Sequence, residues 1–192
     1  MNQFRLDLDA TRCAQAHQDA HCGKMLLELV QQLCTAFPVP RFTFVTWLGT
    51  TPKQRIAADL LPYDRTKAQY NNLVCAWTRA TRANFDNTIE LAQALTVEFR
   101  HRFGKPHGSE AALDWVVRHR AEAQVPDGLL QPFALAMPDE YVPNGGAAWC
   151  VAAYRAYYRA EKRGYWRKSR DPAKPSVWVP AKWTRRDPPE WF

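Results

Sequence analysis

The sequence predicts a mainly α-helical, single-domain protein, and three observations support this fold class. A chain of 192 residues with 46% hydrophobic and 23% charged residues is typical of one globular domain. Apolar residues recur with helical spacing in five segments, bounded by capping residues, glycine or proline. Strand-like alternation is confined to short stretches. We therefore expect about five helices, a short extended N-terminal segment and a proline-broken, basic C-terminal tail.

The first half of the chain begins with alternating apolar and polar residues at positions 4–8, which indicate a short strand or extended start. Asp9 is placed to cap a long helix at residues 10–36, which two prolines then end. Residues 41–48 are β-branched and aromatic, so a short strand is possible there. Residues 51–62 contain two prolines and predict a loop with one helical turn.

The second half is expected to contain the other helices, at residues 66–81, 84–103, 109–123 and 147–163. Gly104 ends the second of these, and Ser109 caps the third. Residues 125–146 contain four prolines and form a long irregular loop of the kind that is often functional. We expect residues 1–163 to form a helical catalytic domain, with residues 164–192 as a basic, tryptophan-rich extension packed on it.

Several functional classes are disfavoured by composition. No apolar run approaches the roughly 20 residues that a membrane span needs, and the N-terminus does not resemble a signal peptide, so we expect a cytoplasmic protein without membrane contact. The five cysteines form no CxxC pair and predict buried, reduced thiols. Phosphate-loop, dinucleotide-binding and GxSxG motifs are missing, which argues against P-loop kinases and nicotinamide-dependent dehydrogenases.

Charge is concentrated at the C-terminal end. Residues 1–153 contain 15 Lys or Arg and 15 Asp or Glu, whereas residues 154–192 contain 11 and 4. Half of the eight tryptophans lie in the same segment. Cations contact phosphates and aromatic rings stack on bases, so we expect DNA as a partner. A solvated tail with tryptophans packed on the domain, or another acidic partner, remains an alternative. The DNA-binding candidates are Arg163, Trp166, Arg167, Lys168, Trp183 and Arg185.

A polar stripe crosses the first predicted helix. At about 100° per residue, His17, His21, Lys24 and Glu28 fall on one narrow strip with apolar flanks, while Asp19 falls on the opposite face. We expect Lys24 and Glu28 to be buried or to line a cleft, paired with each other because buried charges need partners. Two interpretations follow: a structural ion pair with hydrogen-bonded histidines, or a catalytic site.

A metal site at the two histidines is less favoured. His residues at i and i+4 can share a divalent ion, but the glutamate that follows the first histidine in HExxH enzymes is replaced here by Gln18. No third ligand is evident. We therefore predict no cofactor, although Mg²⁺ bound with a phosphate-containing substrate is possible.

Other candidate substrate-binding residues lie outside this helix. In the loop FALAMPDEYVP, Asp139 and Tyr141 follow an apolar anchor and can hold an amine, unless these side chains are simply solvated. The last helix presents one face and a neighbouring basic stripe that can contact phosphates, unless its tyrosines belong to the core. These residues are Tyr154, Arg155, Tyr158 and Lys162. Arg79 is spaced to grip a phosphate together with Arg82.

Several motifs together resemble a family of small bacteriophage proteins. They are LDLD at residues 6–9, AxxHxDxHxxKMxLExxQxL at 14–33, ALAMPDEY at 134–141, AYRxYYxxEK at 153–162 and PPEWF at 188–192. The chain is also similar to the α-helical amino acid:DNA transferases of thymidine hypermodification, the glutamyl/putrescinyl thymidine pyrophosphorylases. Residues 71–73, Asn-Asn-Leu, depart from the Asn-His-Pro-like segment expected there, which puts a role for that stretch in doubt.

This resemblance implies a phage enzyme in the host cytoplasm that replaces pyrophosphate on a 5-(pyrophosphoryloxymethyl)uracil base with an amine, such as an amino acid or polyamine. Lys24, with Arg79 and the C-terminal cations, would hold pyrophosphate. His17 or His21 would take the amine proton, oriented by Glu28, and Asp139 would anchor the incoming ammonium. The base would leave the stack to be reached.

Two alternatives remain at this point. One is a DNA glycosylase or nuclease-like enzyme that uses the same polar stripe for acid–base chemistry. The other is a non-catalytic DNA-binding accessory protein in which the stripe is structural.

Overall fold

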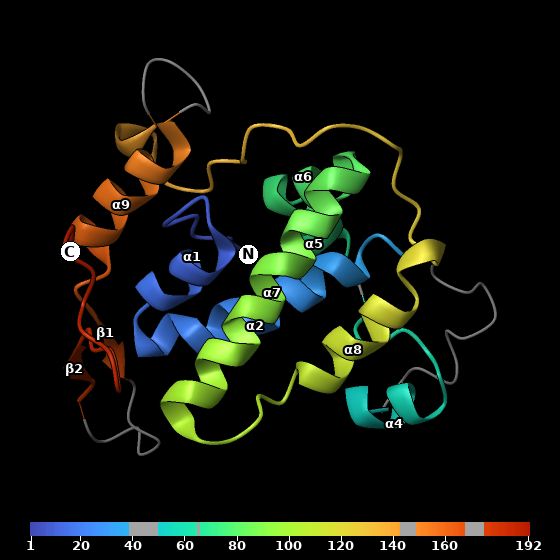
Figure 1. The fold of residues 1–192 in the computed structure, drawn as a ribbon, viewed down its shortest axis with the longest axis horizontal. Helices are drawn as coiled ribbons and strands as arrows, with labels where there is room; N and C mark the ends of the chain where they lie inside the picture. Colours follow the sequence, from blue (N-terminus) through green and yellow to red (C-terminus); the bar gives the residue numbers. More distant parts are fainter. Residues whose placement is uncertain (39–49, 65, 143–148, 168–174) are drawn as a thin grey trace.

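The core of the molecule is the packing of α7 (Arg82–Phe103) across α2 (Asp19–Cys34), shown in Figure 1. The structure is a computed structural model that describes residues 1–38, 50–64, 66–142, 149–167 and 175–192. Apolar side chains recur on α2 at helical spacing and are buried against matching residues of α7, so hydrophobic burial holds the pair together. The predicted mainly α class is confirmed.

Shorter helices surround this pair. They are α1 (Ala10–Ala16), α4 (Pro52–Ala57), α5 (Lys67–Tyr70), α6 (Leu73–Ala80), α8 (Glu110–Arg118) and α9 (Cys150–Glu161), with 3₁₀ turns η1 (Arg120–Glu122) and η2 (Asp139–Tyr141). α1, α6 and α8 each pack on α7, and α4 packs on α8. Within the described ranges, no helix combines the length and apolar character needed to cross a membrane.

The predicted helix at residues 10–36 is wrong in one respect, because it is two helices. Asp9 does cap α1 by accepting the Arg12 N–H at 2.8 Å. At His17 and Gln18, however, the backbone is extended, with ψ of 135° and 161°. α2 then begins at Asp19 in a new direction.

Side chains from distant parts of the chain explain this break. Trp183 donates its indole N–H to the Ala16 carbonyl at 3.0 Å. Arg102 donates to the carbonyls of Gln15 and His17 at 2.9 and 2.6 Å. Carbonyls at the end of α1 are therefore satisfied by tertiary donors rather than by a continuing helix.

Other boundaries also shift for local reasons. The helix predicted at 66–81 splits into α5 and α6, because the Asn72 side chain accepts the Val74 N–H and starts a new helix. The helix predicted at 109–123 ends at Arg118. Gly104 ends α7 in the left-handed region, with φ of 66°, as expected. The strand expected at 41–48 lies outside the described residues.

The N-terminal segment is largely buried, and it has the extended, non-helical start that was expected at residues 4–8. Gln3, Phe4, Arg5 and Leu6 are all buried, whereas the Leu8 side chain is 71% exposed. The Gln3 amide donates to Gln32 of α2 at 2.6 Å and to Thr78 of α6 at 3.0 Å. Polar partners on several helices thus replace solvent for this segment.

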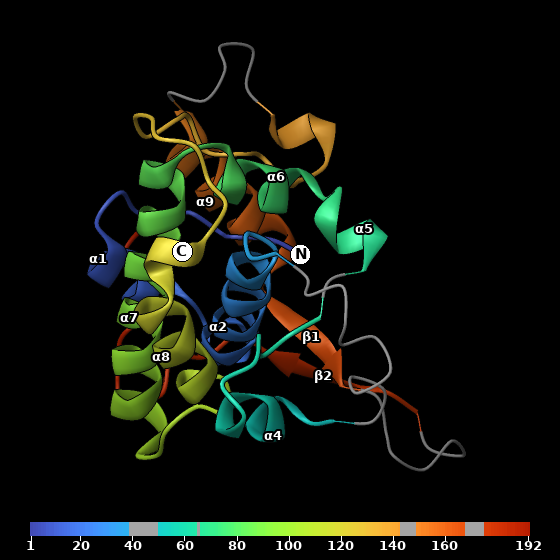
Figure 2. The same ribbon diagram turned by 90° about the vertical axis from the view of Figure 1, so that its right-hand side faces the viewer.

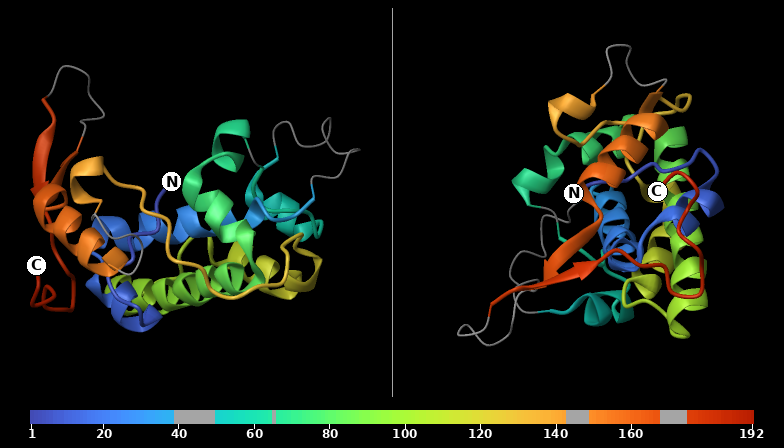
Figure 3. Two further views of the ribbon diagram at one scale, coloured as in Figure 1. Left: turned by 90° about the horizontal axis from the view of Figure 1, so that it is seen from above. Right: turned by 90° about the vertical axis from the view of Figure 1, so that its left-hand side faces the viewer.

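The predicted extended tail contains a hairpin. β1 (Gly164–Arg167) pairs antiparallel with β2 (Val177–Pro180), and the hairpin projects from the helices (Figure 3). Gly164 is required there, because a Cβ would lie 2.6 Å from the Trp178 ring. Residues 181–192 then return to the helices, where Thr184 binds Asp19 through its N–H and hydroxyl at 2.9 and 2.6 Å.

Candidate functional site

The predicted polar stripe is only partly assembled. α2 lies beside the N-terminal segment and α9 (Figure 2). Its residues His21 and Glu28 contact those two elements, and Lys24 lies between them in sequence with helical spacing. His17 lies before the break between α1 and α2, so the angular argument that placed it on the same helical face does not apply. Asp19 points away from the stripe, toward Arg102 and the C-terminal segment. The candidate functional site is therefore the α2 face.

His21 is held by Tyr158 of α9. Its Nδ1 lies 2.7 Å from the phenol oxygen, which also accepts the Gln18 backbone N–H at 3.0 Å. The phenol has one hydrogen, and His21 Nδ1 is the one acceptor for it among the described residues. We therefore assign Nδ1 as the acceptor, which leaves the proton of the neutral ring on Nε2.

The second ring nitrogen of His21 is available to a ligand. In the described part of the chain it has no hydrogen-bond partner, and, unlike Nε2 of His17, it is not sealed from solvent. Burial, followed by the charges of His17, Lys24 and Lys162, lowers the pKa of His21 to about 3. The ring is thus neutral at pH 7 and presents an N–H donor within reach of the electrostatic influence of Lys24 and Lys162.

Lys24 and Glu28 differ in exposure, and the expected burial of Lys24 is wrong. The Lys24 side chain is 60% exposed, and its ammonium lies 3.7 Å from Glu28, whose side chain is largely buried. Glu28 accepts the Asn2 backbone N–H at 2.8 Å. The carboxylate therefore anchors the N-terminal segment, and Lys24 remains free to meet an anion from solvent.

His17 is a structural residue. It is fully buried, and its Nδ1 lies 2.7 Å from the Cys13 carbonyl, to which it donates. Burial lowers the pKa of His17 to about 4 despite that hydrogen bond. No substrate amine can reach the ring, so the expected role of His17 as a base is not supported.

Two residues of the last helix extend the α2 face differently from the prediction. Tyr158 supports His21 but is fully buried, so it positions that ring instead of contacting substrate. The Lys162 ammonium lies 4.6 Å from the centre of the Tyr157 ring, at the C-terminal end of α9. Lys162 therefore joins Lys24 as a cation beside His21.

The loop candidates have mixed positions. Asp139 is exposed on η2, which agrees with the alternative that this side chain is simply solvated. Tyr141 donates to Glu161 at 3.1 Å and packs on Tyr157.

Tyr154 of α9 is fully buried, donates to the Ala134 carbonyl at 2.8 Å and accepts the Ala136 N–H. Tyr154 therefore belongs to the core, and its predicted substrate contact is not supported.

Arg79 is already engaged by the protein. It donates to the Thr35 hydroxyl at 2.9 Å and to the Tyr70 carbonyl at 2.8 Å, and its guanidinium covers the Tyr70 ring at 3.7 Å. These contacts join α6 to α5 and to the end of α2. Its position is therefore fixed without a phosphate.

Among the predicted DNA-binding residues that the structure describes, one is buried and two are exposed. Trp183 is buried in the core, which corrects its expected contact with DNA. Arg185 donates to the His101 carbonyl and adopts a left-handed conformation, with φ of 59°. Arg163 is exposed beside the hairpin. The side chains of Trp166 and Arg167, and all of Lys168, lie outside the described residues.

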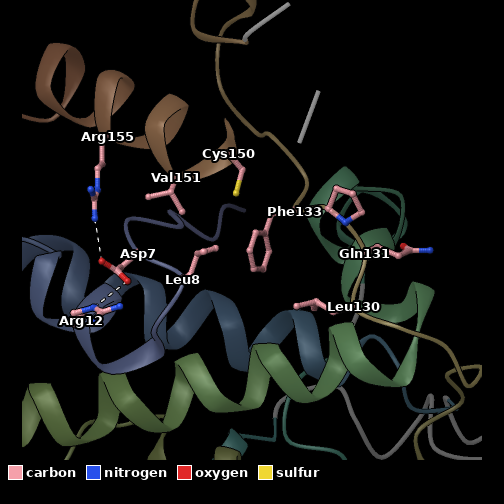
Figure 4. Close-up of a pocket in the computed structure, with 10 residues that line it drawn as sticks. Asp7, Leu8, Arg12, Leu130, Gln131, Phe133, Cys150, Val151 and Arg155 are labelled. Atoms are coloured by element: carbon pink, nitrogen blue, oxygen red, sulfur yellow. Dashed lines mark hydrogen bonds and ion pairs between the residues drawn. The ribbon is translucent and has the colours of Figure 1, made fainter. Parts of the chain in front are cut away.

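The sequence did not reveal a second group, at the junction of α1 and α9. Asp7 binds Arg12 at 3.1 Å and Arg155 at 3.0 Å (Figure 4). Burial opposes the charge on Asp7, but hydrogen bonds from the Asp9 N–H and Arg12 hold its pKa below the usual value. LDLD includes Asp7, but only the fold brings Arg155 to it.

No group of three or more His, Cys, Asp or Glu side chains placed to hold a metal ion is found in the described ranges. The α2 face offers the N–H donor of His21, the ammonium groups of Lys24 and Lys162, and the Glu28 carboxylate. Such a set stabilises anionic oxygens. Comparison with protein-family models, curated proteins and solved structures gave no match.

Proposed function

We propose that this protein is a DNA-modifying transferase of the phage type, which replaces pyrophosphate on a 5-(pyrophosphoryloxymethyl)uracil base with an amine such as an amino acid. The observation that carries the proposal is the His21 arrangement. A neutral imidazole is held by Tyr158 at Nδ1, and the charges of Lys24 and Lys162 lie close enough to help lower its pKa. Three donors, two of them cationic, suit a pyrophosphate leaving group.

The reaction is a substitution at the exocyclic methylene carbon. The amine nitrogen forms the new C–N bond while the C–O bond to pyrophosphate breaks and its electron pair leaves with the oxygen. His21 Nε2–H, Lys24 and Lys162 stabilise that oxygen's growing charge. Glu28, the carboxylate beside Lys24, accepts the proton that the amine loses. This assignment moves the proton acceptor from histidine to Glu28.

DNA as the carrier of the substrate is supported by charge. The formal net charge is +7, and the excess lies at residues 154–192, which include the projecting hairpin. Two-stranded ribbons fit nucleic-acid grooves, and cations beside them contact phosphates. We propose that the hairpin holds the strand while the α2 face meets the displaced base.

The test is a single-turnover assay. Duplex DNA containing 5-(pyrophosphoryloxymethyl)uracil is incubated with the protein and a mixture of amines, then digested, and the nucleosides are weighed. The expected result is a mass that matches loss of pyrophosphate and gain of an amine. Base loss or strand nicking would favour a glycosylase or nuclease, and tight binding without chemistry would favour an accessory protein; either outcome overturns the transferase proposal.

Lys24→Gln tests the site within the same assay. Because the Lys24 side chain is 60% exposed, the substitution should leave the free energy of unfolding unchanged while slowing product formation about tenfold or more. Lys105→Gln is the matched control, since Lys105 is also exposed but lies beyond α7. Equal rates for both variants would remove the α2 face from the mechanism.

A further inference from the structure

A cavity that does not include His21 lies between the N-terminal segment and α1, residues 130–133, and α9. Its volume is about 580 Å³, within the range of sites for small organic ligands. The walls are mostly apolar, formed by Leu8, Leu130, Pro132, Phe133, Cys150 and Val151. Asp7, Arg12 and Arg155 close one end, as Figure 4 shows. From this arrangement we infer a binding site for an aromatic monophosphate, that is, a ring or nucleobase that carries a phosphate group.

The charged end is built before any ligand arrives. Arg155 donates through Nε to the Leu6 carbonyl at 2.7 Å and through Nη2 to Asp7, and its guanidinium lies 5.2 Å from the Trp191 ring centre. Arg12 uses only Nε, on the other oxygen of Asp7. These contacts fix Arg155, and Asp7 orients the more exposed Arg12, so part of the conformational entropy cost of anion binding is already met.

The donors that remain point to the class of anion. In the described part of the chain, Arg155 Nη1 and both terminal nitrogens of Arg12 have no hydrogen-bond partner. Asp7 neutralises only one of the two positive charges. Donors from two guanidinium groups on separate helices suit the three oxygens of a tetrahedral phosphate better than a planar carboxylate.

The apolar middle points to a ring. Phe133 is covered on its inner side by Arg5, whose guanidinium lies 4.5 Å from the ring centre, and it contacts Trp77. Leu8 and Val151 stand across from Phe133 in Figure 4. Leu8 is 71% exposed, so a flat group between it and Phe133 would remove apolar surface from water.

A neighbouring cavity of about 610 Å³ shares Asp7, Arg12 and Arg155 and adds Arg185 and Arg186. Asp187 and Glu190 also line this second cavity, so the arginine pair stands between an apolar compartment and a charged one of mixed sign. A ring with a phosphate fits the first compartment and its boundary, whether it is a free nucleotide or the 5′-phosphorylated end of a DNA strand. The inference does not rest on the transferase proposal, because it concerns separate residues and is read out by binding.

Isothermal titration calorimetry on the full chain tests this site. The probes are dTMP, phenyl phosphate, thymidine and inorganic phosphate, with an oligonucleotide in 5′-phosphorylated and unphosphorylated forms. We expect dTMP and phenyl phosphate to bind at least about tenfold tighter than thymidine or phosphate alone, because each of those lacks one half of the ligand. A preference for the phosphorylated oligonucleotide over dTMP would identify a strand end as the source, and the reverse a free nucleotide.

Two exposed positions supply variants that should fold normally. Leu8→Asp places a carboxylate in the cavity and should weaken dTMP binding about tenfold, while Leu129→Asp, at an even more exposed leucine outside the cavity, should not. Arg12→Gln should weaken binding similarly, with Arg100→Gln as the control for loss of an exposed, ion-paired arginine. Failure of both aromatic phosphates to bind, or binding unaffected by Leu8→Asp and Arg12→Gln, would overturn the inference.

Discussion

Replacing Tyr158 by phenylalanine removes the hydroxyl that connects α9 to the start of α2. The ring would keep its packing, including the contact with Phe4 at 5.4 Å between ring centres. Two interactions would be lost: acceptance of the Gln18 N–H, and the hydrogen bond to His21 Nδ1. Tyr158→Phe therefore tests both the stability of the α1–α2 junction and the assigned state of His21.

The loss of stability in Tyr158→Phe follows from the backbone N–H of Gln18, which is left without an acceptor. The Gln18 N–H is buried, and a buried donor without an acceptor costs about 1–3 kcal/mol. No cavity opens apart from the volume of one oxygen. We expect the free energy of unfolding in urea to fall by about 2 kcal/mol, and Tm by about 4–8 °C. Tyr165→Phe, at an exposed tyrosine without a hydrogen bond in the described region, should change neither.

Nitrogen NMR of the imidazole rings gives the second measurement. In the natural chain at pH 7, His21 should show the neutral form with its proton on Nε2. In Tyr158→Phe that preference should weaken, because the donor that remains near Nδ1, the Gln18 side-chain amide, lies 3.5 Å away. If His21 carries its proton on Nδ1 in the natural chain, or if its state is the same in both proteins, the geometry inferred for the α2 face is wrong.

Three further predictions concern pH, the buried ion network and DNA. Burial lowers the pKa of His17 from 6.5 in the unfolded chain to about 4 in the folded protein. Between these two values the unfolded state binds a proton and the folded state does not. The free energy of unfolding therefore falls as the pH falls from about 6.5 to about 4. From His17 alone, the loss between pH 7 and pH 5 should be about 2 kcal/mol, measured by urea titration, and His17→Met should show a correspondingly shallower slope. Arg102→Met leaves Glu98 and Asp19 without their fully buried partner and should destabilise the fold by about 3–5 kcal/mol in the same assay; a loss below about 1 kcal/mol would contradict the network described. Arg163→Gln with Arg167→Gln should weaken DNA binding and reduce the slope of log affinity against log salt by about 2, with circular dichroism confirming the fold; an unchanged slope would exclude both arginines as phosphate contacts.

Helix ends that depend on residues a few positions apart could be predicted from the sequence. Asp9 caps α1 by accepting a nearby N–H, and Gly104 ends α7 because its left-handed conformation suits glycine. Both outcomes depend on residues a few positions apart. The helical class, the start of α1 and the end of α7 could therefore be predicted without tertiary information.

The break at His17 could not be predicted, because its cause lies far along the chain. Arg102 and Trp183 supply the donors that replace helical hydrogen bonds there. On one continuous helix, His17 and His21 would share a face. One of the four predicted stripe residues, His17, is consequently a structural residue, while His21, Lys24 and Glu28 lie on α2.

Composition alone could not predict which charged and aromatic side chains are buried. Charge and tryptophan content favoured a nucleic-acid contact for the whole tail, but Trp183 fills the core and Arg186 pairs with the largely buried Glu98 at 2.5 Å. Arg5 is buried against Trp77 and Phe133, where residue type alone would place it in solvent. Partners for such residues come from several elements and appear only in the fold.

The meeting of the two chain ends at Tyr158 has a consequence for synthesis. Phe4 and Phe192 both pack on that ring, at 5.4 and 6.2 Å between centres. On the ribosome, residue 4 emerges long before residue 192, so the helices between them expose apolar surface until residues 183–192 leave the exit tunnel. Nascent chains stalled before residue 183 should therefore bind chaperones and be digested by protease, whereas released chains that include residue 192 should resist.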